Sequence, residues 1–179
     1  SPVVSIVDTR SLEVSAVELL SGSNGLRGLC ISPDGRYAFV THLLSNFQMV
    51  PFRLDMGWIN TNVISILDIQ QRKLDTTIGM DELDLGAGNP WDVGYTGDGS
   101  LVCVSLSGVH ELAVIDSSVL VSDTARRTMS PMMGVWPIYP SLGASLWQRV
   151  KLPGKGPRGM AFADSKVFVA EYFSDSVAE

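Results

Sequence analysis

The sequence predicts an all-β fold assembled from repeated antiparallel sheets, and a recurring hairpin is the first observation behind this prediction. The hairpin pattern occurs at Gly25–His42 (GLRGLCISPDGRYAFVTH), at Asn89–Leu106 (NPWDVGYTGDGSLVCVSL) and, one residue shorter, at Gly156–Glu171 (GPRGMAFADSKVFVAE). Each copy has two strand-forming runs around a turn that contains Asp with Gly or Ser. A hairpin that recurs at nearly constant spacing indicates a repeat architecture.

A second strand pattern recurs behind each hairpin at the same period. It reads VVSIVD at Val3–Asp8, VISILD at Val63–Asp68 and LAVID at Leu112–Asp116, and DSVA at Asp175–Ala178 begins a further copy. Two interlocking strand patterns with one period, and four short strands per repeat, predict a β-propeller of four-stranded antiparallel blades. The chain would then hold about three blades, made of two whole repeats and two complementary halves.

The composition is that of an ordinary globular protein and narrows the classes of partner. The chain has 179 residues, of which 45% are hydrophobic and 18% are charged, with a formal net charge of −6. This charge argues against nucleic acid as a partner, because phosphate binding needs a basic face. No apolar run reaches the roughly 18 residues of a membrane-spanning helix. Cys30 and Cys103 each lie in an apolar strand, which favours buried free thiols, with a disulfide as the alternative.

The first segment, 1–24, is predicted to supply strands three and four of one blade, at Val3–Asp8 and Glu13–Leu20. The first whole blade then covers 25–79. Its four strands are expected at Leu29–Ile31, Tyr37–Thr41, Val63–Ile69 and Lys73–Ile78.

An insertion at 43–61 (LLSNFQMVPFRLDMGWINT) interrupts this blade between its second and third strands. The insertion contains too many large apolar residues for a loop surrounded by water. We therefore expect it to fold over the face of the propeller or to pack on a neighbouring unit. A lid over a bound ligand is the alternative.

The second whole blade is predicted at 80–152, with an insertion at 117–146 that is rich in Pro and Met. A short helix is expected to begin near Asp116, and the prolines argue against regular structure further on. Methionine and aromatic residues there suit an irregular packed surface or a partner interface. The strands of this blade are expected near Trp91–Thr96, Leu101–Leu106, Glu111–Ile115 and Trp147–Leu152.

The last segment, 153–179, is predicted to form the first half of a further blade, so that it complements the half blade at the N-terminus. Together these pieces amount to three blades. Three blades do not close a ring, since propellers have roughly four to eight. Other blades, from the same chain or from another chain, are therefore the expected partners.

Aligning the repeats places Arg27, Trp91 and Arg158 at one position, just before the innermost strand of each blade. In a propeller this position lies near the mouth of the central channel. Two arginines that converge there can hold a carboxylate or a phosphate through paired hydrogen bonds. Asp92 occupies the next position and is a candidate partner for them. We predict a ligand-binding site formed by these four residues, and ion pairs with acids of adjacent blades are the alternative.

A metal site is the second possibility that the repeats raise. His42 and Glu171 share one aligned position at the end of the second strand. They would be the ligands to test, together with a further group. The other histidine, His110, lies in a tight turn, where a structural hydrogen bond is the better interpretation. No nucleophile elbow, phosphate-binding loop or dinucleotide fingerprint is present in the sequence.

Several segments go beyond a generic repeat. SPDGRYAFVTH and NVISILDI resemble the YVTN-type family of bacterial and archaeal propellers, which is related to the propeller of haem d1 nitrite reductase. Less periodic segments resemble one subgroup, in which such a propeller precedes a cytochrome c peroxidase-like domain that carries CxxCH. These segments are Thr41–Gln48, Gly57–Asn62, Asn89–Val93, Gly108–Asp116 and Leu152–Ser176.

The resemblance implies a periplasmic or cell-surface protein linked to cytochromes. It implies a c-type haem in a following domain, whereas no cofactor is expected in these residues, which contain no CxxCH. No catalytic residue of the family's propeller carries over to this sequence. We therefore predict a non-catalytic binding or scaffold module that takes a protein or a small anion at the channel mouth. A metal-dependent hydrolase or lactonase-like enzyme and a surface-layer or adhesion repeat are the alternatives.

Overall fold

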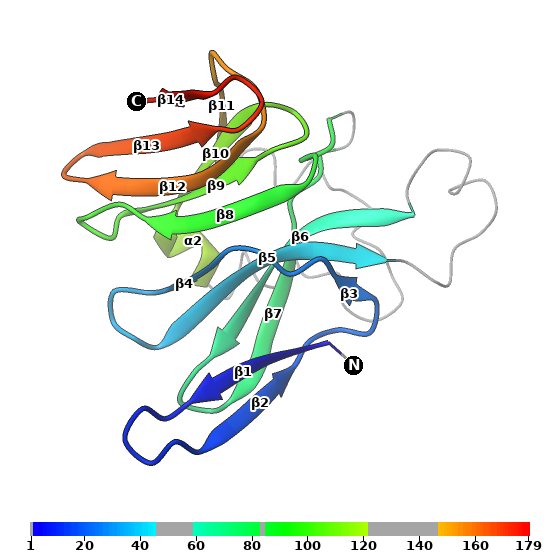
Figure 1. Cartoon of the computed structure of the whole chain (residues 1–179). Helices are drawn as coiled ribbons and strands as arrows, with labels where there is room; N and C mark the ends of the chain where they lie inside the picture. The colour runs from blue at the N-terminus through cyan, green and yellow to red at the C-terminus, as the bar shows by residue number, and fades with distance from the viewer. Residues whose placement is uncertain (1, 46–58, 83–84, 122–146) are drawn as a thin grey trace.

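The structure, a computed structural model of the chain, describes residues 2–45, 59–82, 85–121 and 147–179. Every sheet in this part of the chain is antiparallel, and the hairpin strands pair with their neighbours in sequence. Figure 1 shows the sheets following one another from the blue N-terminus to the red C-terminus. The predicted all-β fold class of antiparallel propeller blades is confirmed.

Four sheets make up the described fold, and they are named here in chain order. The first sheet consists of β1 (Val3–Val7) and β2 (Val14–Glu18). The second contains β3 (Ser23–Asn24), β4 (Leu29–Ile31), β5 (Tyr37–Ser45), β6 (Asn60–Asp68) and β7 (Lys73–Gly79). The third contains β8 (Pro90–Tyr95), β9 (Leu101–Leu106), β10 (Glu111–Asp116) and β11 (Trp147–Lys151). The fourth contains β12 (Pro157–Ala163), β13 (Lys166–Glu171) and β14 (Ser176–Ala178).

The innermost strand is irregular at the same place in three sheets. In the second sheet it is divided into β3 and β4, which both pair with β5. In the third sheet its register shifts between Pro90 and Val93, and in the fourth it shifts between Pro157 and Met160. Such bulges redirect side chains and increase the local twist. The aligned position singled out in the sequence falls inside the bulge in each case.

The tight turns of the repeated hairpins form as their residues predict. Gly35 and Gly99 take positive φ values of 70° and 72°, which glycine adopts without steric cost. In the shortened third hairpin Asp164 takes this conformation, with φ at 51°. The carboxylate of Asp98 accepts hydrogen bonds from Thr96 and Ser100, and these bonds lower its pKa to about 2.

The first predicted insertion is narrower than the sequence suggested. Leu43–Ser45 and Asn60–Thr61, which were expected in the first insertion, extend the ladder between β5 and β6. The rest of that insertion, 46–58, lies outside the described residues. In the second insertion, helix α2 (Ser117–Val121) forms where a short helix was expected. The remainder, 122–146, also lies outside the described residues.

The fourth sheet contains a third strand, β14, in addition to the β12–β13 hairpin. β14 pairs with β13, with Val169 opposite Ala178 and Glu171 opposite Ser176. It thus takes the third-strand position that Asn60–Asp68 and Glu111–Asp116 take in the second and third sheets.

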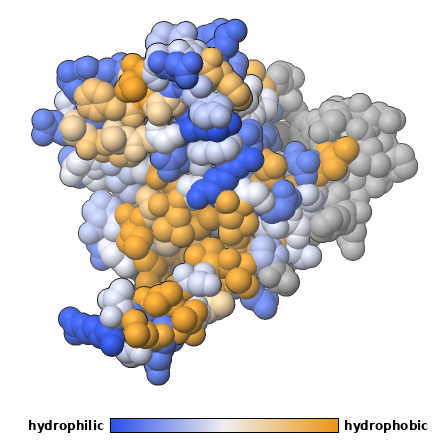
Figure 2. All heavy atoms as spheres, in the orientation of Figure 1, coloured by the Kyte–Doolittle hydropathy of each residue, from blue (hydrophilic) through white to orange (hydrophobic). Residues whose placement is uncertain are grey.

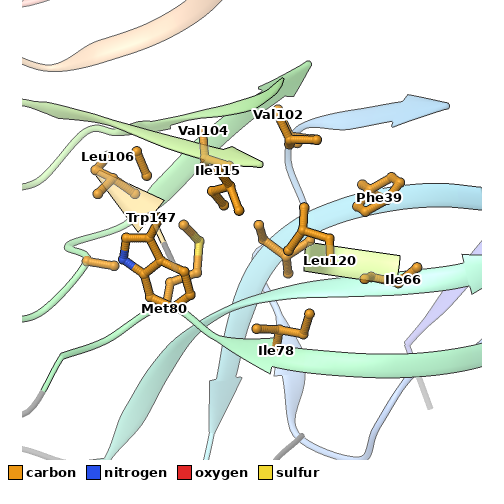
Figure 3. Packing of buried hydrophobic residues seen from close by; sticks show 14 of the residues in the cluster. Phe39, Ile66, Ile78, Met80, Val102, Val104, Leu106, Ile115, Leu120 and Trp147 are labelled. Atoms are coloured by element: carbon orange, nitrogen blue, oxygen red, sulfur yellow. The ribbon is translucent and has the colours of Figure 1, made fainter. Parts of the chain in front are cut away.

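A hydrophobic core fills the space between each pair of successive sheets. The largest lies between the second and third sheets, where Phe39 meets Tyr95 edge-on at 5.6 Å between ring centroids. Leu120 of α2 and Trp147 of β11 complete this core (Figure 3). Smaller cores join the first sheet to the second and the third to the fourth. No helix in the described part of the chain has the length and hydrophobicity needed to span a membrane.

Candidate functional site

The structure brings together the three residues that share the aligned position. The guanidinium carbons of Arg27 and Arg158 each lie 4.2 Å from the ring centroid of Trp91. Each residue comes from the innermost strand region of a different sheet, so Trp91 of the third sheet receives one arginine from either neighbouring sheet. Cation–π contacts of this kind contribute about 0.5–1 kcal/mol when exposed and about 2 kcal/mol when desolvated.

An open pocket of about 370 Å³ lies beside this stack, between the second, third and fourth sheets. Its lining consists of Arg27, Gly28, Trp91, Asp92 and Gly159. Three of the four predicted binding residues therefore line one pocket, and the fourth, Arg158, contacts the same indole ring.

Hydroxyl groups on the second strands hold the bulges in place. Thr41 Oγ1 accepts a hydrogen bond from the Gly28 N–H and donates one to the Trp91 carbonyl of the next sheet, both at 3.0 Å. Ser105 does the same one repeat later, accepting from the Asp92 N–H at 3.0 Å and donating to the Arg158 carbonyl at 2.7 Å. We call these paired contacts the hydroxyl bridges. They fix the backbone that carries the stacked side chains.

A second set of contacts between sheets repeats in the same way. Asn62 Oδ1 accepts a hydrogen bond from the Asn89 N–H at 2.8 Å, and His110 Nδ1 accepts one from the Gly156 N–H at 3.0 Å. Asn89 and Gly156 have positive φ values of 66° and 67°, which point their N–H groups towards the preceding sheet. His110 thus makes the structural hydrogen bond expected from its turn.

Asp92 is placed differently from its predicted role as a partner of the arginines. Its Oδ2 accepts a hydrogen bond from the Met160 N–H of the fourth sheet at 2.8 Å, and its Oδ1 accepts one from the Val93 N–H at 2.9 Å. The carboxylate therefore joins two sheets and forms no ion pair with Arg27 or Arg158 in the described part of the chain.

The positive charges of the two arginines remain without an acidic partner among the described residues. Arg27 donates from Nη1 to Asn89 Oδ1, a neutral group. Arg158 lies 3.6 Å from the Tyr172 ring centroid, and its buried Nε has no hydrogen-bond partner in the described residues. Partial desolvation lowers the pKa of the Arg27 guanidinium, and the charge of Arg158 lowers it further. Two cations thus repel each other beside an open pocket.

The two predicted metal ligands are each bound within their own sheets. The buried His42 ring donates from Nδ1 to the Leu43 carbonyl at 2.9 Å and accepts at Nε2 from Ser65 Oγ at 2.8 Å. Glu171, 2% exposed, accepts from the Gly154 N–H and the Ser176 hydroxyl, both at 2.7 Å. No group of three His, Cys, Asp or Glu in the described residues is arranged to hold a metal ion.

The cysteines are free in the structure. Cys30 packs against the core between the second and third sheets, whereas Cys103 belongs to the core between the third and fourth. Burial raises the pKa of the Cys30 thiol to about 12, with Asp92 adding to the shift, and raises the pKa of Cys103 to about 11. Both thiols are therefore poorly nucleophilic at neutral pH.

Sequence reasoning missed the hydroxyl bridges and the Asn62 contact, and it did not name Gly156 as the partner of His110. A signal for them was present in the repeat alignment, where Thr41, Ser105 and Ala170 share one position. A small hydroxyl residue that recurs inside a buried strand is unusual, because a buried hydroxyl needs a hydrogen-bond partner.

Comparisons with known proteins agree with the fold. No protein-family model matches the chain. The hydrazine synthase subunit beta of Kuenenia stuttgartiensis is 23% identical over 176 residues, which cover 97% of this chain and 45% of that protein. The solved hydrazine synthase of the same organism superposes with a TM-score of 0.76 at 23% identity, over 98% of this chain and 50% of that one.

Two further solved structures match less closely. A functionally unknown protein from Desulfotomaculum acetoxidans has a TM-score of 0.54 at 13% identity, covering 96% of this chain and 42% of its own. The periplasmic gluconolactonase of Pseudomonas aeruginosa has a TM-score of 0.54 at 17% identity, and the match covers 92% of this chain and 41% of that one. The chain thus spans half or less of the relatives it matches. At these identities the likenesses establish a propeller-type fold, and the narrower resemblance to the YVTN-type subgroup stays a prediction.

Proposed function

We propose that this chain is a non-catalytic propeller module that binds a carboxylate or phosphate group in the pocket beside Trp91. One observation carries the proposal: Arg27 and Arg158 contact the same indole ring and have no acidic partner in the described residues. The bound group would belong to a small anion or to an acidic partner protein.

The geometry favours an anion for a physical reason. Stacking against Trp91 restricts the two guanidinium groups, so that binding loses little side-chain entropy. An anion would offset the mutual repulsion of the two cations, which adds to desolvation in lowering the pKa of Arg27. Hydrogen bonds to charged groups contribute about 1.5–3 kcal/mol each. The buried Nε of Arg158, whose guanidinium group stacks on Trp91, is a donor without a partner in the described residues.

The setting of such a module is also part of the proposal. A relative is named as a subunit of hydrazine synthase, which supports a role in an assembly. Another solved match is named as periplasmic, which supports an extracytoplasmic location. The c-type haem that the sequence resemblance implies would have to be held by residues outside this chain, because no CxxCH occurs in it.

Titration calorimetry with inorganic phosphate and with citrate tests the site. We expect Arg27→Gln and Arg158→Gln to weaken binding at least tenfold, which corresponds to about 1.4 kcal/mol. Arg36→Gln is the matched control, because Arg36 also stacks on an aromatic ring, Tyr37 at 4.9 Å, but lies outside the pocket. The Arg36→Gln variant should bind phosphate and citrate with the same affinity as the unmodified chain.

A steric variant separates loss of charge from loss of space. A Cβ atom at Gly159 would meet no atom within 4 Å, so Gly159→Leu should fold normally and reduce the pocket. Ala161→Leu, at an exposed position of the same strand, is its control. The assignment is wrong if Gly159→Leu binds both anions as well as the control does, or if neither anion binds the unmodified chain at millimolar concentrations.

A further inference from the structure

We propose that the anion-binding site takes a small linear dianion, with one carboxylate on Arg27 and the other on Arg158, across the edge of the Trp91 ring. This inference rests on the proposed function of the same site and adds the spacing of the two charges in the ligand. It is carried by the order of the stacked groups, by the size of the pocket and by the position of the negative charge in its lining.

The two guanidinium groups lie on opposite faces of the indole. Trp91 belongs to β8, which contacts the second sheet, with Arg27, on one side and β12, with Arg158, on the other. Both Cζ atoms lie 4.2 Å from the ring centroid. Two cations at this distance on a single face would touch each other, which their like charges disfavour. The two Cζ atoms are therefore at most twice 4.2 Å apart.

The covered faces of the indole argue against a ligand that binds by stacking. Aromatic groups and nucleobases bind a tryptophan through the face of its ring. Both faces of Trp91 are occupied by guanidinium groups. The site therefore presents to a ligand the edge of the ring with a positive charge on either side, so that the charges of the ligand determine binding.

Arg158 is restricted to donating within its own plane. All N–H groups of a guanidinium lie in that plane. Its faces pack against aromatic rings, with the ring centroids of Trp91, Tyr172 and Phe173 at 4.2, 3.6 and 5.4 Å from Cζ. A carboxylate that approaches the edge of this guanidinium can accept a pair of hydrogen bonds from it.

Arg27 provides the second edge. Its side chain is exposed and donates from Nη1 to the neutral Asn89 Oδ1, which leaves further donors of the same planar group for a ligand. The site opens on the face of the molecule that carries the innermost strands. Figure 2 shows hydrophilic residues on this face, between the regions of β8 and β4.

The pocket beside the ring is larger than a single carboxylate or phosphate requires. Its volume of about 370 Å³ lies within the range of about 300–1,000 Å³ that is typical of small-molecule sites. Gly28 and Gly159 line it without side chains. The pocket therefore has room for a chain of atoms that joins two anionic groups.

Asp92 determines where the charges of the ligand lie. Its carboxylate belongs to the lining of the same pocket. It would repel an anionic group placed midway between the two arginines. The favoured ligand therefore has its negative charges at its two ends and an uncharged middle.

The separation of the arginines sets the length of the ligand. An extended chain advances about 1.2 Å per bond, so a separation of at most twice 4.2 Å corresponds to about five to seven bonds between the two carboxyl carbons. Adipate, pimelate and suberate have this length. Succinate is too short to reach both guanidinium groups.

Titration calorimetry with linear dicarboxylates at constant ionic strength tests the spacing. The series runs from succinate to sebacate, and each member is compared with the monocarboxylate of equal chain length. We expect the best of adipate, pimelate and suberate to bind roughly tenfold more tightly than its monocarboxylate, because the second contact forms within one complex. Succinate should show little gain over its monocarboxylate.

Single variants locate the two ends of the ligand. Arg27→Gln and Arg158→Gln should each reduce the best dicarboxylate to about the affinity of its monocarboxylate, because one contact is left. Arg36→Gln should retain the optimum, because Arg36 lies outside the pocket.

The outcomes separate this inference from the proposed function. An affinity that rises steadily with chain length in both series overturns the two-point binding, as does an optimum that survives in either single variant. Phosphate binding would then leave the proposed function standing. If phosphate and both series of carboxylates fail to bind the unmodified chain, the proposed function is overturned as well.

Discussion

At the scale of single residues, Gly28 lies close to the backbone of the neighbouring sheet, at Trp91–Val93. A Cβ atom there would come within 2.6 Å of Asp92 Cα and 2.8 Å of the Trp91 carbonyl oxygen. Both neighbours are backbone atoms that cannot turn aside. We expect Gly28→Ala to lower the free energy of unfolding by about 1–3 kcal/mol, measured by urea denaturation. Gly159→Ala, at the aligned position of the fourth sheet, should cost far less, and equal losses would contradict the argument.

The buried His42 makes stability depend on pH. Burial lowers its pKa below the ordinary value of 6.5, so the folded state keeps the ring neutral while the unfolded chain takes up a proton. Stability is therefore full above pH 6.5 and falls as the pH drops below it, by up to about 1.4 kcal/mol at one unit below. The carboxylate of Asp98 loses its stabilising bonds only at lower pH, since its pKa is about 2.

Denaturation measured between pH 7.5 and 5.5, in a chain that carries His110→Asn, tests whether His42 makes the unfolding free energy depend on pH. This substitution keeps a side-chain acceptor like that of Asn62 and leaves His42 as the remaining histidine. Adding His42→Gln should flatten the dependence of the unfolding free energy on pH. A slope that persists in the double variant would assign the effect to other groups.

Asp92 is expected to stabilise the fold and to weaken the binding of anions. Its carboxylate lines the pocket and also accepts hydrogen bonds from Met160 and Val93. We expect Asp92→Asn to lower stability by about 1 kcal/mol, because an amide has only one acceptor oxygen for two donors. The same variant should bind phosphate several-fold more tightly, since a negative charge leaves the pocket. Calorimetry and urea denaturation on one preparation measure both, and weakened binding would contradict the assigned site.

The closeness of Arg27, Trp91 and Arg158 in space was predictable from the sequence, whereas their role in binding stays a prediction. Repeat alignment selected Arg27, Trp91 and Arg158 because a propeller turns an aligned position into a spatial cluster. The stacking and the role of Asp92 were not predictable. The role of Asp92 depends on which backbone N–H groups lie beside it, and the stacking depends on how the sheets approach each other. Neither of these can be read from the residue types in the sequence.

At the scale of elements, hydrogen bonds of side chains on the second strands connect one sheet to the next. Thr41→Val would keep the shape of the side chain and remove the hydroxyl bridge, leaving the Gly28 N–H and the Trp91 carbonyl without their partner. We expect a loss of about 1–3 kcal/mol in the free energy of unfolding. Thr41→Ser should retain most of the stability, because Ser105 performs this role one repeat later. Equal losses in both variants would instead indicate a packing effect.

The strands were predicted well and their irregularities were not. Periodicity and turn residues located β5, β6, β9 and β10, because alternating burial and Gly-containing turns are direct consequences of side-chain chemistry. The bulges left no comparable signal, since they arise where a sheet must twist against its neighbour. The first insertion was predicted to begin at residue 43, but Leu43–Ser45 continue β5, which the repeat pattern predicted to end at Thr41.

At the scale of the whole molecule, each sheet of the described chain contacts the next one through a hydrophobic core and through hydrogen bonds of side chains. In an array of repeats of this kind, each unit is stabilised by the interfaces with its neighbours as well as by its own contacts.

The bulge in each innermost strand has a consequence for how such a protein can diversify. Its backbone is held by hydrogen bonds of Thr41 and Ser105, which do not involve the side chains of Arg27, Trp91 or Arg158. One amino acid per blade can therefore be exchanged without disturbing the scaffold. Gene duplication followed by point substitution at this position would give new ligand preferences at small risk to the fold, which is a form of modular evolvability.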